Sequence, residues 1–198
     1  MPNLIVEQIK ANAPGVIFSA SSFSGLALRN TIDQTLRRLT KSGQIRKIST
    51  GLFCIPKNHP VLGPLNPSLD DIIQAYGHKF GYQIQVHPLS AANMLGLSQQ
   101  VPAKNIYLTD GPNRNLTLGG QNIILKHVCP RKLLGIGTKV GLVVQALYSF
   151  GPKGIDQSLI NKIKMIVDQE DCQKLQGWLS LMPSWMQKAV NMLINNVP

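Results

Sequence analysis

Apolar and polar positions between residues 30 and 43 recur with the period of an α-helix. One face carries the apolar residues Ile32, Leu36 and Leu39, spaced at i, i+4 and i+7. At about 100° per residue, the opposite face is polar and basic. It carries Gln34, Arg37, Arg38 and Lys41. Asn30, with Asp33 three residues later, predicts a capping box at the start of the helix, and Gly43 predicts its end.

Shorter elements are expected on both sides of this helix. Leu4, Ile5 and Ile9 fit one face of a first helix, and a second short helix is expected near Phe23. Downstream, residues 44–48 and 52–55 predict two strands joined by a turn, and the first of them is basic. Three helices followed by a basic hairpin is the order of a winged helix-turn-helix. In that fold the third helix enters the major groove of DNA and the hairpin contacts the backbone or the minor groove.

The charge of the chain favours a polyanionic partner. Its 20 Lys and Arg residues stand against 9 Asp and Glu residues, which gives a formal net charge of +11. Residues 1–60 hold 8 of these cations and only 2 of the anions. Lys and Arg neutralise phosphates, whereas Gln and Arg can also pair with adenine and guanine through two hydrogen bonds. We therefore expect double-stranded DNA as the partner. The predicted DNA-binding residues are Thr31, Gln34, Arg37, Arg38, Lys41, Arg46, Lys47 and Ser49.

Two other interpretations of this segment stay open. A helix with one apolar and one basic face is commonly a solvated surface helix. Winged helices also serve as protein-interaction modules, and an amphipathic tail around Trp178 and Trp185 would suit such a role. A homodimer is expected if the chain reads paired half-sites, as helix-turn-helix proteins usually do.

A change in composition divides the chain. Prolines and glycines at residues 57–67 predict a linker. We expect a winged helix-turn-helix DNA-binding domain over residues 1–58, a mixed α+β domain over residues 66–151 and a helical extension over residues 152–198. The expected fold class is α+β.

Local patterns predict the elements that follow the linker. Ser68 is expected to cap a helix whose buried stripe runs to Phe80, and Ser90 to cap a second, short helix. A half-buried strand is expected at residues 82–86, where Gln83 and Gln85 alternate with apolar residues. Further elements are expected as strands at 105–109, 116–118 and 122–128, an apolar helix at 140–151, and helices in the tail that are interrupted at Pro183.

Several classes of protein are not expected. No stretch of the sequence is long and apolar enough for a transmembrane helix, and the N-terminus lacks the pattern of a signal peptide. The three cysteines are isolated in the sequence, which favours a reducing compartment. The cytoplasm is therefore the expected location.

Catalytic and metal chemistry is not expected either. His127 and Cys129 lack the paired spacing of a zinc site. A metal-dependent nuclease is an alternative suggested by Asp110 and Lys126, but Ile124 stands where a second carboxylate would be needed. We expect no enzyme, no catalytic residue, no bound metal and no cofactor.

Two stretches resemble the antitoxins of the AbiEi type. The first is the helix and hairpin from Leu36-Arg37-Arg38-Leu39 through Gly43-Gln44-Ile45-Arg46-Lys47 to Pro56. The second is the stretch Ser90-Ala91-Ala92-Asn93-Met94-Leu95-Gly96-Leu97-Ser98-Gln99-Gln100-Val101-Pro102, followed by Tyr107-Leu108-Thr109-Asp110-Gly111. The resemblance covers residues 14–151, and its second stretch is the more specific one.

The resemblance implies a bacterial antitoxin of the abortive-infection, type IV toxin–antitoxin kind. Such a protein represses its own promoter through an N-terminal winged helix. Its C-terminal domain counters a nucleotidyltransferase-like toxin without forming a stable complex with it. The resemblance implies that the helix and hairpin bind DNA through the positions that match the family. These positions are Gln34, Arg37, Arg38, Lys41, Arg46 and Lys47. A stand-alone regulator remains an alternative.

Overall fold

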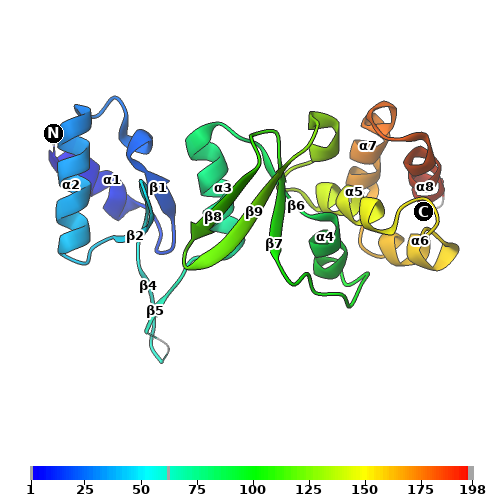
Figure 1. Cartoon of the computed structure of the whole chain (residues 1–198), viewed down its shortest axis with the longest axis horizontal. Coiled ribbons are helices and arrows are strands. Elements are labelled where there is room, and N and C mark those ends of the chain that lie inside the picture. The colour runs from blue at the N-terminus through cyan, green and yellow to red at the C-terminus, as the bar shows by residue number, and fades with distance from the viewer. Residues whose placement is uncertain (1, 62, 196–198) are drawn as a thin grey trace. The chain divides into compact units, whose positions relative to one another are not determined.

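The computed structural model describes residues 2–61 and 63–195, and these residues have the predicted α+β class (Figure 1). They form two compact units. Unit 1 contains the chain up to residue 82 together with residues 116–122, and unit 2 contains residues 83–115 and the chain from residue 123 onward. The stretch expected to be a linker, residues 57–67, lies inside unit 1.

Unit 1 begins with three helical segments around one apolar core. They are α1 (Pro2–Ala11), the 3₁₀ turn η1 (Ala20–Phe23) and α2 (Arg29–Lys41). Helices α1 and α2 pack side by side (Figure 1). The predicted stripe of α2 is buried in this core, as are Ile5 and Phe23 from the other two segments. The three helical segments predicted from the sequence are thus confirmed, the second of them as a 3₁₀ turn.

The predicted capping box of α2 is wrong. The helix begins at Arg29, so Asn30 lies inside its first turn, and the N-cap residue is Leu28, which has no side chain that could cap the helix. Asp33 instead pairs with Arg29, one helical turn away, at 3.0 Å between Oδ2 and Nε. The predicted end is confirmed, because Gly43 follows the helix with a φ of +75°.

A three-stranded antiparallel sheet packs beside these helices. Its strands are β1 (Ile17–Ser19), β2 (Arg46–Ser49) and β3 (Leu52–Cys54), in the order β1-β3-β2. Strands β2 and β3 are the predicted hairpin, and Gly51 in its turn has a φ of +71°. Strand β1 pairs Phe18 with Phe53 of β3, and the two rings stack with their centroids 6.2 Å apart. This pairing joins the first part of the unit to the hairpin.

The expected linker has secondary structure of its own. Strands β4 (Lys57–His59) and β5 (Gly63–Leu65) pair as a small antiparallel hairpin within this stretch. Helix α3 (Leu69–Phe80) follows, and Ser68 caps it as predicted, because its Oγ accepts the main-chain N–H of Asp71 at 3.1 Å. Its stripe is buried except for Phe80, which is 42% exposed at the last residue of the helix.

Unit 2 contains most of a four-stranded mixed sheet, whose order is β6-β7-β9-β8. The strands are β6 (Ile84–Val86), β7 (Asn105–Thr109), β8 (Arg114–Leu118) and β9 (Gln121–His127). Strand β7 pairs antiparallel with β6 and parallel with β9. The predicted outward position of Gln85 is wrong, because its side chain is 3% exposed and its amide donates to the carbonyl of Leu134 at 3.4 Å.

Helices make up the rest of unit 2. They are α4 (Pro88–Met94), the 3₁₀ turn η2 (Pro130–Leu133), α5 (Lys139–Phe150), α6 (Gln157–Lys164), α7 (Gln169–Gly177), the 3₁₀ turn η3 (Leu179–Leu181) and α8 (Ser184–Ile194). Helix α4 begins earlier than expected, with His87 rather than Ser90 as its N-cap residue. Helix α5 shares one apolar core with α6, α7 and α8, and the four helices are labelled in Figure 1. Trp178 and Trp185 are half-buried against this core.

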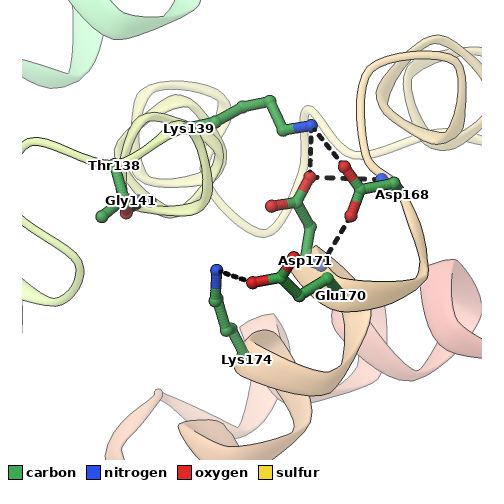
Figure 2. A network of polar contacts seen from close by, with 7 residues as sticks. All are labelled: Thr138, Lys139, Gly141, Asp168, Glu170, Asp171 and Lys174. Atoms are coloured by element: carbon green, nitrogen blue, oxygen red, sulfur yellow. Dashed lines mark hydrogen bonds and ion pairs between the residues drawn. The ribbon is translucent and has the colours of Figure 1, made fainter.

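An ion-pair network joins the starts of α5 and α7 (Figure 2). The ammonium group of Lys139 contacts the carboxylates of Asp168 and Asp171, at 3.0 Å from Oδ2 of Asp168. Asp168 also caps α7, because its Oδ1 accepts the N–H of Asp171 at 2.9 Å. That hydrogen bond and the nearby ammonium lower the pKa of Asp168 from 3.8 to about 2. Charged groups thus fix α7 against α5 at the edge of their shared core.

Candidate nucleic-acid interface

Helix α2 and the β2–β3 hairpin line an open hollow of about 490 Å³ in unit 1. Arg29, Arg37 and Lys41 line it from the helix, and Lys47 lines it from the hairpin. The hollow therefore brings together three of the predicted DNA-binding residues, Arg37, Lys41 and Lys47, from segments that are separate in the sequence.

Local structure explains why these side chains meet. Leu36 and Leu39 are almost completely buried, which fixes the rotation of α2 about its axis and leaves Arg37 and Lys41, one turn apart, exposed. Lys47 is exposed on β2, where it lies opposite Phe53 of β3, another residue of the hollow. The apolar core thus sets the positions of the cations.

A further cation reaches the hairpin from α3. Lys79 donates a hydrogen bond from Nζ to the carbonyl of Thr50 in the turn, at 2.5 Å. A Cβ atom added to Gly51 would lie 2.7 Å from the same Nζ, so the turn and the ammonium are in close contact. Burial and the positive charge of Arg29 lower the pKa of Lys79. No local sequence signal indicates this contact, because Thr50 and Lys79 are 29 residues apart.

Negative charge around the hollow is low. Asp33 is the acidic residue among those that line it, and its carboxylate is held by Arg29. No ion pair within residues 2–61 and 63–195 includes Arg37, Lys41, Lys47 or Lys79. Cations without carboxylate partners attract phosphate oxygens, and hydrogen bonds between charged partners are stronger than those between neutral ones.

The other predicted DNA-binding residues lie elsewhere on unit 1. The guanidinium of Arg46 donates to Oδ1 of Asn66, and Arg46 lines a separate hollow beside the tip of the β8–β9 hairpin. Gln34 and Arg38 are exposed on α2 but do not line the hollow of about 490 Å³. The two remaining predicted residues, Thr31 and Ser49, are half-buried. The predicted set is thus distributed over several surfaces, with three members at the hollow.

Asp110 and His127, the candidates for nuclease and metal chemistry, have structural partners. Oδ1 of Asp110 accepts the main-chain N–H of Gln83 at 2.8 Å, so this carboxylate holds the chain where it enters β6. Nδ1 of His127 lies 2.9 Å from the carbonyl of Gly111. Among the described residues no three His, Cys, Asp or Glu side chains gather in a way that could hold a metal ion. The expectation that the chain is not an enzyme stays a prediction.

In the part of the chain that the structure describes, no helix has the length and apolar character needed to cross a membrane.

Comparison with known proteins identifies a family. The model of a family of unknown function, DUF6088, matches residues 4–175. This span includes α2, the β2–β3 hairpin, α3 and the whole four-stranded sheet. No curated protein matches the chain.

Proposed function

The chain belongs to the DUF6088 family of unknown function, and we propose that it is a DNA-binding transcriptional regulator. The observation that carries the proposal is the hollow between α2 and the β2–β3 hairpin. Four cations without carboxylate partners line or border it: Arg37, Lys41, Lys47 and Lys79. Phosphate contacts of this kind supply much of the affinity of proteins for DNA and fix their position on the duplex.

The order of elements supports a winged helix-turn-helix as the DNA-binding fold. This proposed fold consists of α1, η1, α2 and the β2–β3 hairpin, with α2 as the recognition helix and the hairpin as the wing. Gln34 and Arg38 are exposed on α2 and are therefore available to base edges in the major groove. The cations of the hollow then contact phosphates on one side of α2.

The resemblance to antitoxins of the AbiEi type extends the proposal. On this basis the DNA is the chain's own promoter, the chain acts in the cytoplasm as an antitoxin, and its functional counterpart is a nucleotidyltransferase-like toxin. Paired half-sites in the promoter would be read by a homodimer.

Fluorescence anisotropy tests the proposal directly. We expect the full-length protein to bind DNA from upstream of its own gene more tightly than scrambled DNA at physiological salt. Arg37→Ala and Lys47→Ala should weaken binding to both DNAs by similar factors, because phosphate contacts carry no sequence information. Lys153→Ala, which removes an exposed cation from unit 2, is the matched control.

Residues that read bases should behave differently. Replacing Gln34 or Arg38 by alanine should reduce the preference for the promoter, by about 1–3 kcal/mol for each base contact that is lost. Equal binding of the wild-type protein to promoter and scrambled DNA, or no binding to either, would refute the regulator proposal.

A further inference from the structure

Unit 1 contains a second, larger cavity whose role the DNA-binding surface does not explain. It has a volume of about 880 Å³ and is lined by residues of β1, η1 and α3, the first and last of which are labelled in Figure 1. Cavities of about 300–1,000 Å³ are typical of sites that bind small molecules. Its size therefore suits a metabolite better than a single ion.

The lining of the cavity combines apolar and hydroxyl-bearing side chains. Val16, Ile17 and Leu52 supply apolar surface. Ser19, Ser21, Ser22 and Ser68 supply hydroxyl groups. The Oγ atoms of Ser19 and Ser21 are 2.6 Å apart and share a hydrogen bond, so one hydroxyl hydrogen of this pair remains free to donate. An apolar surface with a few convergent polar groups is the usual composition of a ligand site.

The charge of the lining favours an anion. Lys57, His78 and Lys79 are its basic residues, and Asp71 is its acidic residue. Oδ2 of Asp71 already accepts a hydrogen bond from Oγ of Ser68 at 2.6 Å. No ion pair in the described part of the chain involves either lysine of the cavity. Lys57 and Lys79 therefore give the lining positive charge that no carboxylate offsets in an ion pair, whereas Asp71 is already engaged by Ser68.

Lys79 connects this cavity to the DNA-binding surface. Its side chain lines the cavity, while its Nζ is hydrogen-bonded to Thr50 in the turn of the β2–β3 hairpin. Thr50 and Gly51 in turn line the hollow between α2 and the hairpin. An anion bound to Lys79 would neutralise a charge next to the DNA and compete with the carbonyl of Thr50 for the ammonium.

We propose that the cavity binds a phosphate monoester of a small metabolite, and that binding weakens the affinity for DNA through Lys79. A phosphate group accepts hydrogen bonds at three oxygens, and the lining supplies donors in Lys57, Lys79, the hydroxyl of Ser22 and one hydroxyl of the Ser19–Ser21 pair. The apolar wall then contacts the organic part of the ligand. The binding site stands by itself, whereas the coupling rests on the proposed DNA-binding function.

Isothermal titration calorimetry on the full-length protein tests the site without DNA. The probes are AMP and glucose 6-phosphate, with adenosine, glucose and inorganic phosphate as comparisons. We expect at least one phosphorylated probe to bind, and to bind more tightly than its unphosphorylated form and than phosphate alone. Lys57→Met and Lys79→Met should each weaken this binding at least tenfold, whereas Lys153→Met should not change it.

Three calorimetric results would overturn the site. They are no binding of either phosphorylated probe, binding of each phosphorylated probe no tighter than that of its unphosphorylated form, and unchanged binding in both lysine variants. Inorganic phosphate binding as tightly as the phosphorylated probes would overturn the assignment to a metabolite. Circular dichroism and thermal unfolding establish that the variants are folded.

Anisotropy with promoter DNA tests the coupling. A saturating concentration of the phosphorylated probe should raise the Kd for DNA at least fivefold, within the usual range of coupling between two sites. By reciprocity, DNA should weaken binding of the probe by the same factor. The effect should disappear in Lys79→Met. An unchanged Kd for DNA would overturn the coupling, whereas absence of DNA binding would refute the proposed function and leave the calorimetric result standing.

Discussion

Replacing Arg37 and Lys47 together with alanine removes two of the four cations at the hollow that have no carboxylate partner. The other two are Lys41 and Lys79. Each phosphate that a protein neutralises lowers the slope of log K against log salt by about 0.9. If all four cations contact phosphates, the slope for the wild-type protein should be about −3.6, and the double variant should retain about half of it, roughly −1.8.

These slopes correspond to large differences in affinity. Between 50 and 200 mM salt, the wild-type protein should lose affinity by about 150-fold, and the double variant by only about 12-fold. The assay is fluorescence anisotropy with scrambled DNA over a salt series, so that base contacts do not contribute. The matched control replaces Lys10 and Lys153, which are exposed and do not line the hollow.

The outcome of this comparison is decisive for the hollow. We expect the control to retain the wild-type slope, because Lys10 and Lys153 lie outside the hollow. The control and the double variant lose the same net charge, so they differ only in the positions of the cations that are removed. If the double variant is folded and keeps the wild-type slope, the hollow does not contact phosphates. If the control loses as much slope as the double variant, DNA is bound by diffuse positive charge rather than by this surface.

Two further predictions concern stability, and urea unfolding measures both. A Cβ atom at Gly141 would overlap the carbonyl oxygen of Gly135, so Gly141→Ala should destabilise the protein by about 3 kcal/mol. A Cβ atom at Gly177 would meet no such neighbour within 4 Å, so Gly177→Ala should change stability by less than about 1 kcal/mol. Asp168 has its pKa lowered to about 2, so its ionised form stabilises the folded state above about pH 4, and this contribution is lost as the pH falls toward 2. Asp168→Asn keeps a capping side chain and should therefore reduce the loss of stability over that range. Equal stability of the two glycine variants, or an unchanged pH profile in Asp168→Asn, would contradict the respective argument.

Features that depend on neighbouring residues were predictable from the sequence. The apolar stripe of α2 is buried as expected, because its period alone defines which face of a helix meets a core. The β2–β3 hairpin and the cap at Ser68 were predicted for the same reason, since turns and caps use side chains only a few residues apart. The predicted capping box at Asn30 is absent, because the helix begins at Arg29, one residue before Asn30, and Asp33 pairs with Arg29.

Burial of polar residues was harder to predict. Alternation in β6 placed Gln85 on an outer face, yet the loop before α5 covers that face and accepts a hydrogen bond from its amide. The pattern of a strand indicates which residues share a face, but not whether another segment of the chain covers it. The proline-containing stretch at residues 57–67 likewise forms a hairpin whose pairing its composition did not indicate.

The sequence by itself determined the amphipathic α2, the basic hairpin after it and the excess of positive charge in the first 60 residues. Only the tertiary structure decided which of those charges act together. It placed Arg37, Lys41 and Lys47 around one hollow, directed Arg46 to Asn66, and brought Lys79 to the turn of the hairpin. The physical reason is that helical and hairpin periodicity is local, whereas electrostatic interaction depends on distances in space that chain folding alone sets.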